Sequence, residues 1–187
     1  AGKDCDADLS RLKKSLQRIK TKGFTIKHID QIIKPLLFLE SNEPLKVWLE
    51  DGGGYQDLLD LVAMILQSLG ESDQLPLKLI GKSMALLFSL IAFIPLLKDS
   101  ASLRSMSLQT IWENIVTIVG NLNVQESEIY GYFAEVRNQL VKQGFFDSKS
   151  ITRMLNILMV EIDDEKVTKK IFLIETMKEI IRSKPPW

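Results

Sequence analysis

Apolar residues recur along most of the chain three and four positions apart, which is the period of one face of an α-helix. Leu9, Leu12, Leu16 and Ile19 keep this spacing, and so do the isoleucines and leucines between residues 24 and 41. No run alternates apolar and polar residues over the length of a strand, and no hairpin turn signal occurs. The pattern predicts an all-α chain.

Prolines and glycines divide the pattern into separate helices. Pro35 lacks the N–H that its turn needs, so we expect it to kink or split the helix in which it lies. Asn42 or Glu43 opens a short helix that accepts Pro44 in its first turn and stops at the glycines 52–54. By the same rules, further helices are predicted over 55–69, 76–94, 102–119, 126–143, 149–161 and 164–182.

Similar segments recur along the chain. A glycine and an aromatic residue stand before an apolar helix at Gly23-Phe24, Gly54-Tyr55 and Gly144-Phe145. Gly54 and Gly144 are 90 positions apart, which is about two units of the ~40 to 47 residues typical of armadillo and HEAT repeats. Residues 42–94 and 136–182 each read as a short helix, a glycine turn and two longer helices, and 9–41 reads as a partial unit.

In this order of helices the chain resembles the armadillo repeat, whose unit has the same three helices, with the two longer ones packed against each other. The resemblance covers most of the chain at the level of pattern, and the middle segment 96–135 fits it poorly. In peptide-binding armadillo proteins, a Trp and an Asn on the third helix hold the ligand backbone. Neither 76–94 nor 164–182 contains a Trp or an Asn, so that mechanism is not implied here. The resemblance implies a short armadillo-like helical repeat array, and a compact helical bundle is the alternative.

The length of 187 residues is enough for one domain with a substantial core. We expect a polar N-terminal tail over 1–7, a single all-α helical-repeat domain over 8–183, and a C-terminal tail or the start of a linker over 184–187. The last segment, Pro185-Pro186-Trp187, favours an excised domain of a longer protein, with Trp187 exposed.

Charge and cysteine content narrow the function classes. The 24 cations balance the 24 acids, so no net field draws the chain to nucleic acid or to an anionic membrane. The segment Arg11 to Lys22 is an exception with six cations and no acid; this fits a helix macrodipole, or alternatively a basic contact patch.

A single cysteine, Cys5, and the absence of a signal peptide indicate an intracellular location, cytoplasmic or nuclear. The uncharged run 83–97 is shorter than the ~20 residues of a spanning helix, so it predicts a core helix without membrane insertion.

The sequence supplies no catalytic, cofactor-binding or metal-binding set. Gly81-Lys82-Ser83 matches the end of a P-loop, but the glycine required five positions earlier is Pro76, and the residues lie inside an apolar helix. His28 is the only histidine, so neither a zinc site with Cys5 nor a Ser-His-Asp set has support, and a polar helix face explains it. We therefore predict that the chain is not an enzyme and has no cofactor.

One helix carries the candidate binding residues. On the helix predicted over 76–94, small and polar residues follow helical spacing and form a narrow stripe: Lys78, Lys82, Ala85, Ser89 and Ala92. Lys78, Lys82 and Ser89 are predicted to form part of a partner-binding surface, and a solvated face without a partner is the alternative. Trp48 and Trp112 stand among apolar neighbours and are predicted to lie in the core.

These observations predict a non-enzymatic protein–protein interaction domain, a scaffold or adaptor that presents a helical-repeat surface to a peptide or protein partner. A self-associating helical structural module, which would form homo-oligomers, is the first alternative. Nucleic-acid binding through the basic N-terminal helix is a further one.

Overall fold

The computed structural model describes residues 2–23, 25–51, 53–70, 77–92, 101–121, 127–160 and 167–183. These residues form helices joined by turns, and no strand occurs among them, which confirms the predicted all-α class. The helices are α1 (Gly2–Lys22), α2 (Ile26–Leu36), α3 (Glu43–Glu50), α4 (Gly54–Gly70), α5 (Leu77–Ala92), α6 (Ala101–Gly120), α7 (Ser127–Lys142), α8 (Ser148–Val160) and α9 (Val167–Arg182), with a short 3₁₀ helix at Leu39–Ser41.

Caps and prolines set the helix boundaries where the sequence predicted them. The side chain of Asn42 accepts a hydrogen bond of 3.1 Å from the backbone N–H of Leu45, so Asn42 caps α3, and Pro44 lies in the first turn. Pro35 splits its helix rather than kinking it, because α2 ends one residue later, at Leu36.

Glycines make the tight turns between helices. Gly23, Gly53 and Gly144 have φ angles of 85°, 74° and 70°, a conformation that favours glycine. Gly54 instead begins α4, and its lack of a side chain lets the backbone lie against the indole ring of Trp48, where a Cβ would overlap the ring. The short helix α3 can therefore turn directly into α4.

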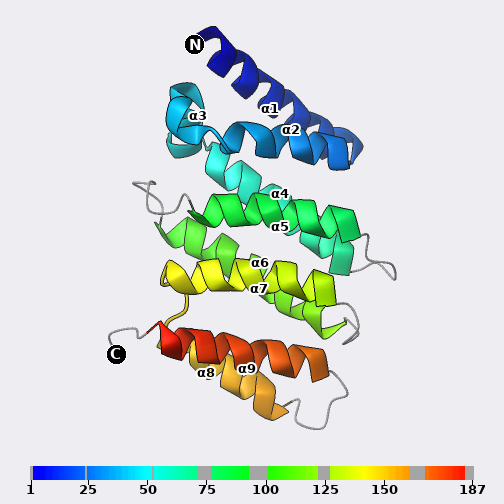
Figure 1. Ribbon diagram of the computed structural model, residues 1–187, viewed down its shortest axis with the longest axis vertical. Coiled ribbons are helices and arrows are strands. Elements are labelled where there is room, and N and C mark those ends of the chain that lie inside the picture. Colours follow the sequence, from blue (N-terminus) through cyan, green and yellow to red (C-terminus); the bar gives the residue numbers. More distant parts are fainter. Residues whose placement is uncertain are drawn as a thin grey trace.

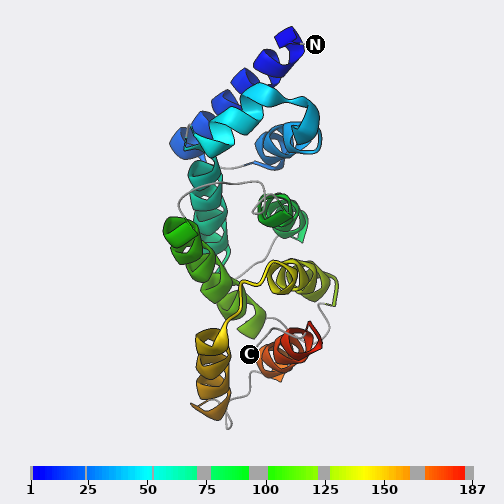
Figure 2. The same cartoon turned by 90° about the vertical axis from the view of Figure 1, so that its left-hand side faces the viewer.

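The helices stack in two layers along the long axis of the molecule (Figure 1). The layer nearer the viewer in Figure 1, called the front layer here, consists of α2, α5, α7 and α9; the back layer consists of α1, α4, α6 and α8. In Figure 2 the front layer lies on the right and the back layer on the left. Each front helix contacts the next one, α2 with α5, α5 with α7 and α7 with α9, while α4 contacts α6 in the back layer. The arrangement is elongated and is consistent with helical repeats.

The segment that fitted the repeat pattern poorly takes part in this stacking. Its described residues, in α6 and the first part of α7, lie between α4–α5 and α8–α9, and α6 contacts α4, α7 and α9. The unit read over residues 136–182 begins within α7, a 16-residue helix that agrees with the single helix predicted over 126–143. A long polar helix in place of a short one obscured the pattern.

The core runs through both layers. Trp48 and Trp112 are buried, which confirms their predicted place in the core. Trp112 stacks on Phe172 with ring centroids 5.5 Å apart and meets Phe146 edge-on at 4.9 Å, so it joins α6 to α9 and to the turn before α8.

The ends of the chain are described only in part. Residues 2–7, where the sequence predicted a polar tail, form the first turns of α1. Phe24 and the C-terminal segment 184–187, including Trp187, lie outside the described residues. No helix among the described residues has the length and apolar character needed to cross a membrane.

Candidate functional site

The predicted binding residues lie on the solvent side of α5. Lys78 is exposed and Lys82 and Ser89 are half-buried, whereas the opposite side of the helix is buried in the core. The Ser89 hydroxyl donates to the carbonyl of Ala85 at 3.1 Å, so this side chain stays close to its own helix. The spacing of four and seven residues thus brings the three side chains onto one face, as expected for a helix.

Lys82 also joins α5 to the neighbouring helix of the front layer. Its Nζ lies 2.7 Å from Oδ1 of Asp30 on α2. Both side chains remain partly exposed, so the pair contributes only about 0 to 1 kcal/mol to stability. It fixes the position of a cation on the surface more than it stabilises the fold.

Large apolar side chains stand beside the polar stripe. Leu77 and Phe88 of α5 are 36% and 40% exposed. Sequence reasoning missed both, because a leucine or phenylalanine on so apolar a helix is more often buried. We define the α5 surface as Leu77, Lys78, Lys82, Phe88 and Ser89.

The α5 surface is bordered by α7. Gly81 packs against the ring of Tyr132, where a Cβ would come within 3.2 Å of ring carbons. The Tyr132 hydroxyl donates to Glu128 at 3.3 Å. An aromatic ring and a carboxylate therefore continue the surface beyond α5.

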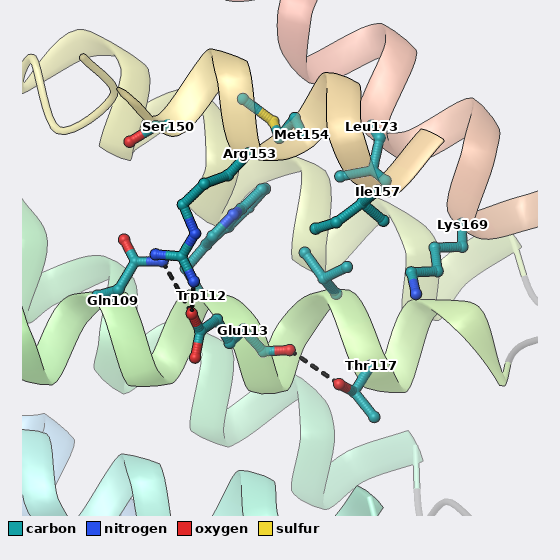
Figure 3. A pocket seen from close by; sticks show the side chains of 11 residues that line it. Gln109, Trp112, Glu113, Thr117, Ser150, Arg153, Met154, Ile157, Lys169 and Leu173 are labelled. Atoms are coloured by element: carbon teal, nitrogen blue, oxygen red, sulfur yellow. Dashed lines mark hydrogen bonds and ion pairs between the residues drawn. The ribbon is translucent and has the colours of Figure 1, made fainter. Parts of the chain in front are cut away.

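A cavity of about 220 Å³ opens between α6, α8 and α9 (Figure 3). Its apolar lining includes Trp112, Met154 and Leu173, and an ion pair between Arg153 of α8 and Glu113 of α6 crosses it. This cavity could not be predicted from the sequence pattern, because its lining comes from three helices. Its lining is mixed, because Gln109, Glu113, Arg153 and Lys169 stand beside the apolar residues.

The basic segment of α1 is partly engaged within the domain. Arg11 pairs with Asp8 at 2.7 Å, Lys20 lies 3.8 Å from Asp57, and the Lys13 Nζ lies 5.8 Å from the centre of the Trp48 ring. The other cations, Lys14, Arg18 and Lys22, are exposed.

The residues that the sequence analysis weighed for metal and phosphate chemistry can now be placed in the structure. Among the described residues, no three His, Cys, Asp or Glu side chains come together as a metal site. His28 lies at the surface with its Nδ1 2.7 Å from the Thr25 hydroxyl. The triplet Gly81-Lys82-Ser83 lies inside α5, and its backbone amides face the helix rather than a phosphate.

In the part of the chain that the structure describes, the pKa values of two side chains are shifted, and both shifts have structural causes. Burial and a hydrogen bond to Glu175 raise the pKa of Tyr130 well above its ordinary range. A hydrogen bond from the backbone N–H of Ser150 lowers the pKa of Asp147, which caps α8.

Comparison with known proteins gives one informative match. The chain is similar to Protein STU1 of Kluyveromyces lactis. The two are 27% identical over 180 residues, which cover 94% of this chain and 13% of that relative. The chain therefore spans only a small part of the length of the curated relative it matches. No family model matches the chain, and no solved structure matches it.

Proposed function

We propose that this chain is a non-enzymatic, armadillo-like interaction domain, which acts as a scaffold or adaptor within a larger intracellular protein. The observation that carries the proposal is the α5 surface. Exposed Leu77 and Phe88 provide apolar anchors, and Lys78, Lys82 and Ser89 provide polar contacts around them. Apolar anchors inside a polar rim are the usual anatomy of a protein-binding site.

The two-layer stack supports this role. A helix pair cannot bury its apolar side alone, so stacked pairs share a core and leave an extended outer face. In the front layer this face spans α2, α5 and α7, and the Lys82–Asp30 pair and the Gly81–Tyr132 contact lie at the boundaries between these helices. A face that is already rigid loses little conformational entropy when a partner binds to it.

Affinity capture with charge-reversed variants tests the proposal. The immobilised chain would be mixed with cell extract, and with purified proteins that bind Protein STU1, which are the first partners to try. We expect Lys78→Glu/Lys82→Glu to lose at least one protein that the unaltered chain captures, by roughly tenfold or more, a loss equivalent to about 1.4 kcal/mol.

Lys14→Glu/Arg18→Glu is the matched control, because it reverses two exposed cations that are also four positions apart on one helix. Full capture by the Lys78/Lys82 variant would contradict the α5 surface as the binding site. If only the Lys14/Arg18 variant failed to capture a nucleic acid or protein, the binding site would be assigned to α1 instead.

A further inference from the structure

Helix α9 exposes a second apolar face, opposite the one that it buries. Val167, Ile171, Ile174 and Ile181 are between 40% and 64% exposed. The buried side of the same helix carries Thr168, Phe172, Leu173, Thr176 and Ile180. With two threonines inside and four aliphatic residues outside, the exposed side of α9 is as apolar as the buried side.

These exposed positions form a straight seam. Val167, Ile171, Ile174, Lys178 and Ile181 follow one another at alternating steps of four and three residues. This is the heptad spacing with which one helix packs along another. We define these residues as the α9 seam.

The neighbouring helix α7 provides an internal comparison. Its exposed positions have the same spacing in the same layer, but they are Glu128, Gly131, Glu135, Asn138 and Lys142. The apolar character of the α9 seam is therefore not a general property of the front layer. Aliphatic residues at this spacing become buried from solvent when another helix packs along them.

The charges around the α9 seam indicate what kind of helix would cover it. Lys178 lies within the seam and Arg182 lies at its end. Lys170 lies beside the seam, next to Ile171. Both acids of α9 already interact within the domain: Glu175 accepts a hydrogen bond from Tyr130, and Glu179 pairs with Arg182 at 3.1 Å. The three cations Lys170, Lys178 and Arg182 against these two acids leave a net charge of +1, which favours acidic side chains opposite the seam and disfavours a second copy of the same seam.

We propose that the α9 seam docks an amphipathic α-helix of a partner protein, with apolar residues at heptad spacing and acidic residues on their flanks. The bound helix lies along the exposed side of α9, opposite the side that packs against the rest of the domain. This site is separate from the α5 surface, so either can fail without the other.

Fluorescence anisotropy with designed peptides tests the proposal on the whole chain. The probe is a labelled peptide of about three heptads with leucine at the seam positions and glutamate on the flanks. A second peptide keeps the leucines and has lysine on the flanks, and a third scrambles the acidic peptide. We expect the acidic peptide to bind saturably. The other two peptides should bind with an affinity lower by roughly tenfold or more.

Variants then locate the bound peptide. Ile171→Ser/Ile174→Ser should weaken binding of the acidic peptide by roughly tenfold or more, and Lys178→Glu should weaken it while strengthening that of the lysine peptide. Glu135→Ser/Asn138→Ser is the matched control on α7, with the same spacing of three residues. Circular dichroism and melting temperatures confirm that all variants fold.

In the peptide-binding assay, three results would overturn the proposal. They are no binding of the acidic peptide, equal binding of all three peptides, and unchanged binding by the Ile171/Ile174 variant. A concentration-dependent dimer that the same variant dissociates would assign the seam to a second copy of the chain, and would also overturn it.

Discussion

The buried guanidinium of Arg137 leads to a prediction that can be worked out from its surroundings. The side chain is 6% exposed, and its Cζ lies 5.4 Å from the centre of the Phe172 ring. Its Nη1 lies 3.6 Å from Oε2 of Glu175 and makes no hydrogen bond with the described residues. Glu175 also accepts the Tyr130 hydroxyl hydrogen bond, so one carboxylate lies against both the guanidinium and the phenol between α7 and α9.

Removing the acid should therefore cost more than removing the cation. Breaking a fully buried pair costs about 3 to 5 kcal/mol when one charge is left behind. Glu175 is 43% exposed, so solvent weakens the interaction, and we expect Glu175→Ala to cost about 2 to 3 kcal/mol. Arg137→Met keeps the apolar stem against Phe172 and leaves no buried charge, so it should cost about 1 kcal/mol or less.

Thermal unfolding followed by circular dichroism measures this asymmetry. For a domain of this size, each kcal/mol lowers Tm by about 2 to 4 °C, which gives about 4 to 12 °C for Glu175→Ala. In the Arg137→Met background, the same Glu175→Ala change should cost only the Tyr130 hydrogen bond, about 1 kcal/mol. The reasoning is refuted if Arg137→Met is as destabilising as Glu175→Ala, or if the two changes add without coupling.

The remaining predictions concern the turns and caps. Gly54→Ala places a Cβ in the ring of Trp48 and should destabilise by about 1 to 3 kcal/mol with a change in tryptophan fluorescence; an unchanged spectrum and Tm would contradict this close approach. Asn42→Ala removes the cap of α3 and should cost about 1 kcal/mol in urea unfolding, whereas Asn42→Asp, which keeps an acceptor, should cost less. Asp147→Asn should lower stability at neutral pH but not in acid. The hydrogen bond from Ser150 holds the folded pKa of Asp147 below its unfolded value, so its contribution is present above about pH 4 and is lost as the pH falls through the folded pKa; a difference that persists at low pH would argue against the carboxylate as its source.

Much of the fold was predictable because its signals are local. Asn42 with Pro44 predicts the start of α3, the glycines predict the turns, and apolar spacing predicts the helices themselves. The predicted face of Lys78 and Lys82 follows from the same helical period. Each of these needs only residues that are a few positions apart.

The other surfaces depend on contacts between distant segments. Tyr130 and Glu175 are 45 positions apart, and Arg153 and Glu113 are 40 apart. The local spacing of residues therefore predicts neither the contacts of Glu175 nor the cavity beside Arg153. The α9 seam was hidden for a different reason. Periodicity indicates that α9 has apolar residues on two sides, but only the packing of α7 against it shows which side remains exposed.

Small-angle scattering combined with light-scattering mass, over a concentration series, tests most directly the claim that a stacked helical array presents these surfaces. A compact chain of 187 residues would have a radius of gyration of about 16 Å. The account predicts a monomer with a clearly larger radius and an elongated distance distribution, in keeping with Figure 2. A monomer of about 16 Å would contradict the stacked array, and a mass rising to that of a dimer would place the α5 surface or the α9 seam in a contact between copies of the chain.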